Sequence, residues 1–307
     1  MISYINILKI VYFHTVLCKI YLTFLDRLLR RKPMGWIPSY KKPSGGGSYT
    51  PPTWSDGTDE EIIEALEKHY AGEIDLTEYW SVGDERVIHL NACNASSSAY
   101  TIASEQDSIW VLMNVGGKQL TTPINNKSEC AFVVGLKGVL SYRNDYFSCA
   151  MGSRVWSDTN NILRYWLNNK WASFDTGLPI MLPASILGIF KEFVAISGSG
   201  EYTDDFSSVN NYFAVPSEKE VLGTNVRGSS IAEDSLSQFE YYKTSANRVK
   251  HYGSSNNYFV SQWWTRTGDY YAYSNVLTIV YDTTYGEVNS VQANSSNKLP
   301  VSPFGVI

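Results

Sequence analysis

The stretch that decides the fold is SIWVLMNV, residues 108–115, which is apolar at most positions. A continuous run of this length, rich in branched and aromatic side chains, predicts a strongly apolar β-strand. Gly116 and Gly117 follow it, and two glycines in succession favour the end of a strand. The sequence therefore predicts a domain built around a β-sheet.

Shorter strand patterns lie on both sides of this run, and from residue 256 the chain is a succession of short strands and turns. Each pattern is a brief apolar or alternating segment bounded by residues that favour turns. The predicted strands are Arg86–Leu90, Ala131–Gly135 and Tyr212–Val215.

Two longer segments carry apolar residues at helical spacing. The first is Asn160–Trp171, which Asp158 or Thr159 would cap, and the second is Pro183–Phe193. A further turn or helix begins at Ser217. Two helices among many short strands predict an α+β fold with long loops.

Residues 1–33 form an apolar segment that ends in the basic residues 30–32. The segment is long enough to cross a bilayer, but Lys9 and Lys19 would be costly in the middle of a membrane. Three interpretations stay open: a weak membrane anchor, an amphipathic helix that packs on a partner, or an upstream extension before a true start at Met34. We favour the third, because the chemistry of the chain changes abruptly there.

Residues 34–57 are rich in proline and glycine, which predicts a flexible linker. A short helix is predicted within residues 58–78, with Thr58 or Asp59 as its cap. The remaining residues, 79–307, are expected to form the main domain.

The composition favours a binding protein. The chain has 25 Lys and Arg against 30 Asp and Glu, so it lacks the basic excess of a nucleic-acid-binding protein. Charged residues make up only 18% of the chain and aromatic residues 14%, so Ser, Thr, Asn and Tyr must supply much of the polar surface. Such surfaces are typical of adhesins.

No metal or cofactor is predicted. The cysteines, at positions 18, 93, 130 and 149, and the four histidines are isolated, without the spacing of a zinc site. We expect buried free thiols, with a Cys93–Cys130 or Cys130–Cys149 bridge as the alternative. Calcium prefers carboxylate ligands, and the candidates are Asp204, Asp205, Asp269 and Asp282. No twelve-residue calcium-binding loop signature accompanies them, so no calcium site is predicted.

Several longer motifs follow one another along the chain. They include WSVGD (80–84), WVLMNVGG (110–117), RYWLN (164–168), YFAVPSEKEVLG (212–223) and WWTRT (263–267). In this order they resemble a family of prophage and gut-phage proteins of unknown function. The resemblance covers about residues 79–307 and implies a C-type-lectin-like fold, akin to the formylglycine-generating-enzyme architecture. Similar folds serve as receptor-binding tail proteins and as the variable proteins of diversity-generating retroelements.

The resemblance implies a structural role for Arg266, which would tie loops together through a carboxylate or carbonyl groups. Glu218 and Glu220 are the candidate carboxylate partners. Trp263 and Trp264 precede the arginine, and we expect one indole in the core and the other near the surface.

The C-terminal stretch is the predicted ligand surface. Between residues 256 and 297 there are six Asn, six Tyr, five Ser and five Thr, which together fill 22 of 42 positions. Tyr offers a large contact area at low entropic cost, and Asn and Ser offer adaptable hydrogen bonds. The alternative is an ordinary set of polar turns. The predicted ligand contacts are Asn256, Asn257, Tyr258, Thr265, Thr267, Asp269, Tyr270, Tyr271, Tyr273, Asn275 and Tyr281.

We therefore expect a non-enzymatic binding protein for a host-surface protein or glycan, located on a phage tail or a bacterial cell surface. The N-terminal region would contact other virion or surface proteins, and no nucleic acid is expected to bind. One alternative is a glycan- or cell-wall-degrading enzyme, motivated by the carboxylates of Asp204, Asp205, Glu218 and Glu220. Another is a structural virion component that assembles through its N-terminal segments.

Overall fold

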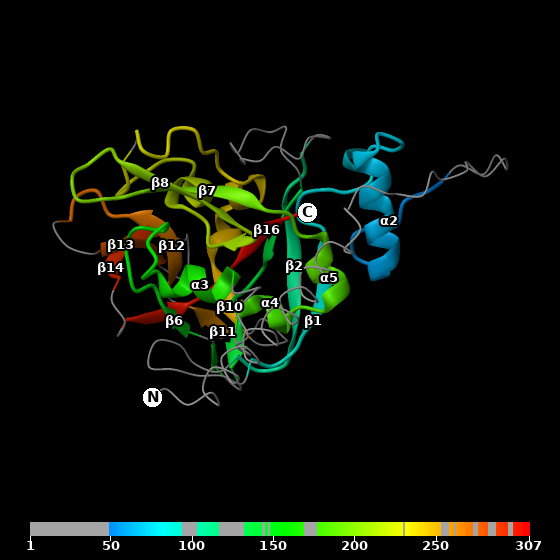
Figure 1. Cartoon of the computed structure of the whole chain (residues 1–307), viewed down its shortest axis with the longest axis horizontal. Helices are drawn as coiled ribbons and strands as arrows, with labels where there is room; N and C mark the ends of the chain where they lie inside the picture. The colour runs from blue at the N-terminus through cyan, green and yellow to red at the C-terminus, as the bar shows by residue number, and fades with distance from the viewer. Residues whose placement is uncertain are drawn as a thin grey trace, which may run out of the picture. The chain divides into compact units, whose positions relative to one another are not determined.

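The computed structural model describes residues 49–93, 103–116, 132–142, 145–146, 148–168, 177–229, 231–252, 258–260, 262–272, 276–281, 287–293 and 297–307. Residues 50–307 form one compact unit, whose elements are labelled in Figure 1. The predicted N-terminal extension, residues 1–33, and most of the predicted linker lie outside the described residues.

A five-stranded antiparallel sheet forms the centre of this unit, in the order β1-β2-β3-β16-β9. The decisive apolar run lies in β2, where residues 110–113 are fully buried, so the predicted strand is confirmed. The other three predicted strands are confirmed as β1, β3 and β9, with ends shifted by one or two residues. The strands are β1 (Glu85–Leu90), β2 (Gln106–Asn114), β3 (Val133–Leu136), β9 (Phe213–Ala214) and β16 (Phe304–Val306).

The rest of the β-structure consists of short strands, as the sequence predicts for the C-terminal region. A three-stranded sheet has the order β12-β13-β14, and the remaining strands pair two by two. The sheet contains β12 (Gln262–Gly268), β13 (Val276–Tyr281) and β14 (Glu287–Gln292). The pairs are β4 (Ser141–Tyr142) with β5 (Asp145–Tyr146), β6 (Ser148–Ala150) with β15 (Lys298–Pro300), β7 (Phe193–Gly198) with β8 (Phe206–Asn211), and β10 (Lys250–Tyr252) with β11 (Tyr258–Val260).

Short helices complete a mixed α and β architecture, so the α+β class is confirmed. The α-helices are α2 (Asp59–Tyr70), α3 (Ile162–Asn168), α4 (Leu178–Met181), α5 (Ala184–Ile189) and α6 (Glu218–Leu222). Single turns of 3₁₀-helix are η1 (Leu76–Glu78), η2 (Glu240–Lys243) and η3 (Ser245–Arg248). Within the described residues, no helix has the length and apolar character needed to span a membrane.

The two predicted helices have different bounds from those expected. Helix α3 begins at Ile162, because the side chain of Asn161, rather than Asp158 or Thr159, accepts the hydrogen bond from the backbone N–H of Arg164 at 2.9 Å. The end predicted for this helix at Trp171 lies outside the described residues. In the second segment, helix α5 covers only Ala184–Ile189, the separate helix α4 precedes the segment, and Phe193 begins strand β7. Apolar spacing alone did not reveal these ends.

The end of the predicted linker is packed against the domain. Trp54 is fully buried, and its carbonyl oxygen accepts a hydrogen bond from the Arg86 guanidinium at 3.2 Å. The indole N–H of Trp80 donates to the carbonyl oxygen of Pro52 at 2.9 Å. Proline and glycine exclude regular secondary structure but not burial, so the prediction of a flexible linker up to residue 57 is wrong for residues 50–57.

Helix α2 belongs to the same compact unit, so the domain boundary predicted at residue 79 is not observed. Thr58 caps the helix through a capping box with Glu61, as predicted for one of the two candidate caps. The buried side chains of Ile62 and Leu66 join the core. Asp59 accepts hydrogen bonds from Arg86 on β1 and from Ser185 on α5, both at 2.6 Å.

Cys93 and Cys149 are buried free thiols, which confirms the prediction for these two residues. Burial raises the pKa of the Cys149 thiol well above its ordinary value. Cys18 and Cys130 lie outside the described residues.

Candidate ligand-binding site

Three tyrosines gather where two loops meet, and we call Tyr202, Tyr270 and Tyr271 the tyrosine face. The ring centroids of Tyr202 and Tyr270 lie 5.7 Å apart, and those of Tyr270 and Tyr271 lie 5.3 Å apart with their planes nearly perpendicular at 88°. Tyr202 is 44% exposed and Tyr271 is 58% exposed. Two members were predicted from the sequence, whereas Tyr202 comes from the β7–β8 loop and was missed.

The loop that carries Tyr202 has an unusual backbone. Gly200, Glu201 and Tyr202 have φ angles of 78°, 59° and 57°, so three successive residues are left-handed. This conformation costs about 1–2 kcal/mol for each non-glycine residue. The backbone N–H groups of Glu201 and Tyr202 donate to the carbonyl oxygens of Asp269 and Tyr270, at 3.2 and 2.6 Å. The strained turn is therefore held against the loop that carries the other two tyrosines.

Asp269 holds the loop that carries Tyr270 and Tyr271 through buried hydrogen bonds. Its carboxylate is 1% exposed and accepts hydrogen bonds from Nε of Arg227 and from the backbone N–H of Tyr271, both at 2.9 Å. The backbone N–H of Tyr270 donates in turn to the carbonyl oxygen of Arg227 at 2.7 Å. Asp269 therefore positions the tyrosine face, and its predicted role as a ligand contact is not supported because a ligand cannot reach it.

Thr265 and Thr267 are also inaccessible, since both are fully buried in β12. The Thr267 hydroxyl donates to Oε1 of Glu233 and accepts from the backbone N–H of Glu218, both at 2.8 Å. Their prediction as ligand contacts is therefore not supported either. Residues 263–268 of β12 are all buried, so this part of the strand has no exposed face.

The same burial corrects the prediction for the two tryptophans. Trp263 and Trp264 are 1% and 0% exposed, so neither indole lies near the surface. Their N–H groups donate to the carbonyl oxygens of Arg248 and Cys149, at 3.1 and 2.7 Å. Each buried donor is thus satisfied inside the core.

The other predicted contacts cannot be placed on the tyrosine face. Asn256, Asn257, Tyr273 and Asn275 lie outside the described residues. The backbones of Tyr258 and Tyr281 belong to β11 and β13, while their side chains are not described.

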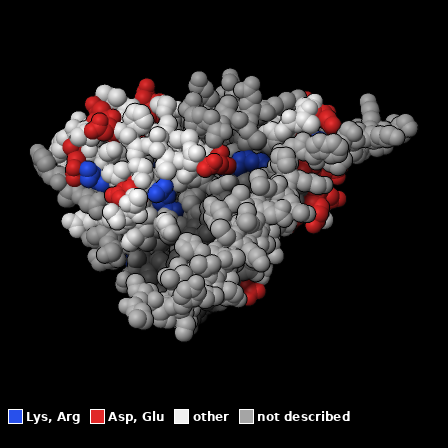
Figure 2. Space-filling view, viewed as in Figure 1, with Lys and Arg blue, Asp and Glu red and all other residues white. Residues whose placement is uncertain are grey.

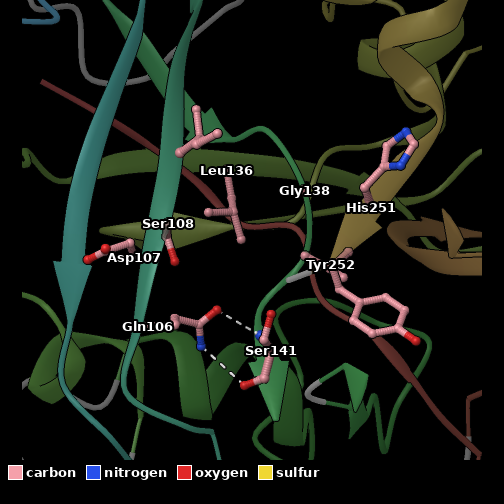
Figure 3. Close-up of a pocket in the computed structure, with 10 residues that line it drawn as sticks. Gln106, Asp107, Ser108, Leu136, Gly138, Ser141, His251 and Tyr252 are labelled. Atoms are coloured by element: carbon pink, nitrogen blue, oxygen red, sulfur yellow. Dashed lines mark hydrogen bonds between the residues drawn. The ribbon is translucent and has the colours of Figure 1, made fainter. Parts of the chain in front are cut away.

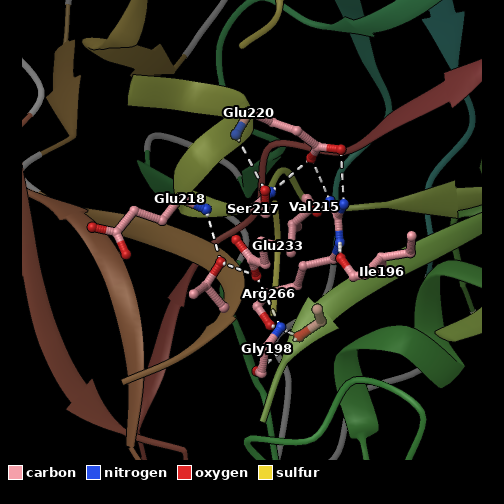
Figure 4. Close-up of polar contacts among 10 residues, drawn as sticks. Ile196, Gly198, Val215, Ser217, Glu218, Glu220, Glu233 and Arg266 are labelled. Atoms are coloured by element: carbon pink, nitrogen blue, oxygen red, sulfur yellow. Dashed lines mark hydrogen bonds and ion pairs between the residues drawn. The ribbon is translucent and has the colours of Figure 1, made fainter. Parts of the chain in front are cut away.

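A buried polar network surrounds Arg266 on β12, as Figure 4 shows. Arg266 is 1% exposed and forms a bidentate salt bridge with the carboxylate of Glu220. The distances are 2.5 Å from Nη1 to Oε2 and 2.8 Å from Nη2 to Oε1. Two further N–H groups of Arg266 donate to the carbonyl oxygens of Ile196 and Val215, at 2.9 and 2.7 Å. The expected role of Arg266 is thus observed, with Glu220 rather than Glu218 as the carboxylate partner.

Glu218 instead organises the loop that follows α6. Its carboxylate accepts hydrogen bonds from the backbone N–H groups of Val226, Arg227 and Gly228, at 2.7, 2.9 and 2.7 Å. Burial raises the pKa of Glu218 above its ordinary value, although these three donors act in the opposite direction. The loop that supplies Arg227 to Asp269 is therefore held by Glu218.

Glu233 joins three elements in the same region. Its Oε1 accepts from the backbone N–H of Gly198 at the end of β7, at 2.9 Å, and from Thr267 on β12. Its Oε2 has no hydrogen-bond partner among the residues that the structure describes. Burial raises the pKa of Glu233 to about 7, so this carboxyl group titrates near neutrality.

The carboxylates that motivated the enzyme hypothesis are not brought together on an accessible surface. Glu218 and Glu220 are buried with structural partners, whereas Asp204 and Asp205 are exposed in the β7–β8 loop. Asp204 accepts a hydrogen bond from the hydroxyl of Ser229 at 2.6 Å. Within the described ranges, no group of three or more His, Cys, Asp or Glu side chains could hold a metal ion.

Exposed apolar side chains are frequent in the chain segments that carry the tyrosine face or contact its loops. Nine large apolar side chains are exposed in the described part of the chain. Five of them lie in three short segments, namely residues 202–206, residues 226–231 and residue 271. Acidic side chains are prominent on the face of the molecule shown in Figure 2. The five exposed apolar side chains are Tyr202, Phe206, Val226, Ile231 and Tyr271.

Replacing Gly200 by alanine is expected to lower the free energy of unfolding by about 2 kcal/mol or more. A Cβ atom there would lie 2.7 Å from the carbonyl oxygen of Asp269, and the φ angle of 78° disfavours any side chain. Urea unfolding measures the loss. Gly188→Ala in α5 is the matched control, because a Cβ atom added there would meet no neighbouring segment within 4 Å; it should be neutral or stabilising. Equal effects of both substitutions would contradict the strained turn.

No protein-family model, curated protein or solved structure matches this chain.

Proposed function

We propose that this chain is a non-enzymatic receptor-binding protein of a phage tail or a bacterial surface. Its domain, which we assign to the C-type-lectin-like folds, would bind a host-surface protein or glycan through the tyrosine face. The mixed architecture of short strands and the buried role of Arg266 are consistent with that assignment. The N-terminal region would contact other virion or surface proteins.

The observation that carries the proposal is a set of exposed tyrosines on a backbone fixed by buried polar contacts. Asp269 and Glu218 anchor the loops from inside, while the rings of Tyr202 and Tyr271 face solvent. A preorganised surface loses little conformational entropy when it binds, and Tyr is the side chain most used in such surfaces. Because the anchors are buried, exposed positions can change without disturbing the fold, as a variable binding protein requires.

Replacing Tyr202 and Tyr271 together by alanine is expected to weaken receptor binding at least about tenfold. The substitutions remove exposed rings and should leave the thermal transition almost unchanged. Binding of the labelled full chain to a panel of intact bacteria and to a glycan array measures the effect.

Tyr165→Ala is the matched control, because Tyr165 is 56% exposed on α3, away from these loops in sequence. The control should bind like the wild type. If the double variant binds cells and glycans as well as the control does, the tyrosine face is not the receptor-binding surface.

A further inference from the structure

The tyrosine face belongs to a surface made by three chain segments, residues 199–205, 225–229 and 269–272. The backbone N–H of Tyr202 donates to the carbonyl oxygen of Tyr270 at 2.6 Å, which joins the first segment to the third. The hydroxyl of Ser229 donates to Oδ1 of Asp204 at 2.6 Å, which joins the second segment to the first. Charges in these segments therefore act on a ligand that contacts the tyrosine face.

The three segments carry four carboxylates and one guanidinium group. The carboxylate of Asp269 contacts the guanidinium group of Arg227 at 2.9 Å, so these two charges compensate each other. The carboxylate of Glu201 contacts Arg154, which lies outside the segments, at 2.8 Å. Half of the negative charge in the segments is thus paired with arginine.

Asp204 and Asp205 carry the other half, and neither has a cationic partner among the described residues. Both residues are exposed, and the Ser229 hydroxyl that contacts Asp204 is neutral. They lie only two and three residues after Tyr202 in the same loop. Two negative charges therefore remain uncompensated on the surface that carries the tyrosine face.

The aromatic rings favour the same kind of ligand as these carboxylates. The negatively polarised face of an aromatic ring attracts a cation that lies within about 6 Å of its centroid. The ring planes of Tyr202 and Tyr271 are inclined at 86° with their centroids 6.4 Å apart, and the planes of Tyr270 and Tyr271 are inclined at 88°. Rings at such steep angles can present two faces to one cation. The rings and the uncompensated carboxylates thus both favour positive charge.

The pocket beside β2 does not compete with this surface. Figure 3 shows the Gln106 amide against Ser141, where it accepts from the backbone N–H at 2.8 Å and donates to the carbonyl oxygen at 3.1 Å. The space in the pocket that is open to the centre of a water molecule is about 20 Å³, enough for one or two waters. Neither a long side chain nor a sugar fits there.

We propose that the tyrosine face binds a lysine or arginine side chain of a protein receptor. This inference rests on the proposed function and narrows its ligand from a protein or glycan to a protein with a basic surface. The cationic group would lie over the rings of Tyr202 and Tyr271. A neutral glycan would gain little from the uncompensated charge, and an acidic glycan would be repelled by it. The net charge of −5 likewise disfavours a second copy of this chain.

Ligand-observed NMR on the full chain tests the proposal with two blocked glycine peptides. One carries a central lysine, and the matched peptide carries norleucine, which has the same carbon stem without the ammonium group. The norleucine peptide should bind at least about tenfold more weakly. Raising the salt concentration from about 0.05 to about 0.5 M should weaken binding of the lysine peptide severalfold and leave the norleucine peptide unaffected.

Replacing Asp204 and Asp205 together by asparagine should weaken binding of the lysine peptide about fivefold. This carboxylate variant keeps an oxygen that accepts from Ser229, so its thermal transition should stay near that of the wild type. Glu60→Gln with Glu67→Gln is the matched control, because it removes two exposed negative charges from α2. The control should bind the lysine peptide like the wild type.

Equal binding of the two peptides, or wild-type binding in the carboxylate variant, would overturn the proposal. Cell binding separates this failure from a failure of the proposed function. If Tyr202→Ala with Tyr271→Ala loses cell binding while the carboxylate variant keeps it, the tyrosine face binds the receptor but the ligand is not basic. If the tyrosine variant keeps cell binding, the proposed function itself fails and the basic ligand with it.

Discussion

Replacing Arg266 by methionine is expected to lower the free energy of unfolding by about 3–5 kcal/mol. The substitution leaves the Glu220 carboxylate buried at 2% exposure without its cationic partner. It also removes the donors that satisfy the carbonyl oxygens of Ile196 and Val215. The loss should be visible as a lower urea midpoint with an unchanged m-value.

A double-mutant cycle identifies the cause of this loss. Glu220→Gln keeps an acceptor for the backbone N–H of Ser217, which Glu220 binds at 2.8 Å, but removes the negative charge. In the double variant neither substituted position carries a buried unpaired charge, so the combined loss should be smaller than the sum of the single losses by about 2 kcal/mol. Strictly additive losses would show that the charge pair itself is not the origin of the effect.

An exposed ion pair provides the comparison. Lys243 and Glu240 contact each other at 2.5 Å on η2, but both side chains are more than half exposed. Lys243→Met should change the free energy of unfolding by less than about 1 kcal/mol. Contact distance alone therefore does not set the energetic effect of a pair, since the burial of Arg266 and Glu220 decides it.

Local patterns in the sequence predicted local structure well. The apolar run of β2 and the N-terminal signals of Thr58 and Ser217 were read correctly because each depends on neighbours within a few residues. The extent of burial was harder to predict. Trp264 and Thr267 lie on a strand that is covered on both faces, and no alternation in the sequence reveals the covering segments.

The candidate site depends on contacts between residues far apart in the chain. Tyr202 lies almost seventy residues before Tyr270, and its left-handed backbone carries no signal beyond the adjacent Gly200. Glu233 gave no signal at all, because an isolated glutamate in a polar loop is ordinarily exposed. Only the folded chain brings it to Gly198 and Thr267.

Lys250 is a second buried titratable group, besides Glu233, whose pKa lies near neutrality. Its ammonium is fully buried and donates to the carbonyl oxygens of Leu136 and Lys137, both at 3.0 Å. It lies 5.0 and 5.3 Å from the ring centroids of Tyr242 and Trp263. Burial lowers the pKa of Lys250 to about 7, and the positive charge of Lys137 acts in the same direction.

Lys250 should therefore make the protein less stable as the pH falls from about 10 to 7. In this range the unfolded chain binds a proton at residue 250 and the folded chain does not, so protons favour unfolding. A shift from 10.5 to about 7 corresponds to at most about 5 kcal/mol. Lys250→Met should abolish this slope, although it also loses two hydrogen bonds at every pH.

Glu233 should have the opposite pH dependence. Its pKa is raised from 4.5 to about 7, so the folded chain keeps its proton in a range where the unfolded chain has released it. Its contribution to stability is complete below about pH 4.5 and is lost as the pH rises to 7, by at most about 3 kcal/mol. Glu233→Gln, which cannot ionise, should gain stability relative to the wild type over this range.

Together these two groups predict a wild-type stability curve with a local minimum near pH 7. Near pH 7 the stability contributions of both groups are close to their least favourable values. A lower pH neutralises Glu233 and a higher pH neutralises Lys250, and either change raises the stability. Urea unfolding between pH 5 and 10 measures the curve for the wild type, Lys250→Met, Glu233→Gln and the double variant. The minimum should lose its alkaline side in the first variant, its acid side in the second and both in the double variant. Parallel curves for all four proteins would show that neither group titrates inside the folded domain.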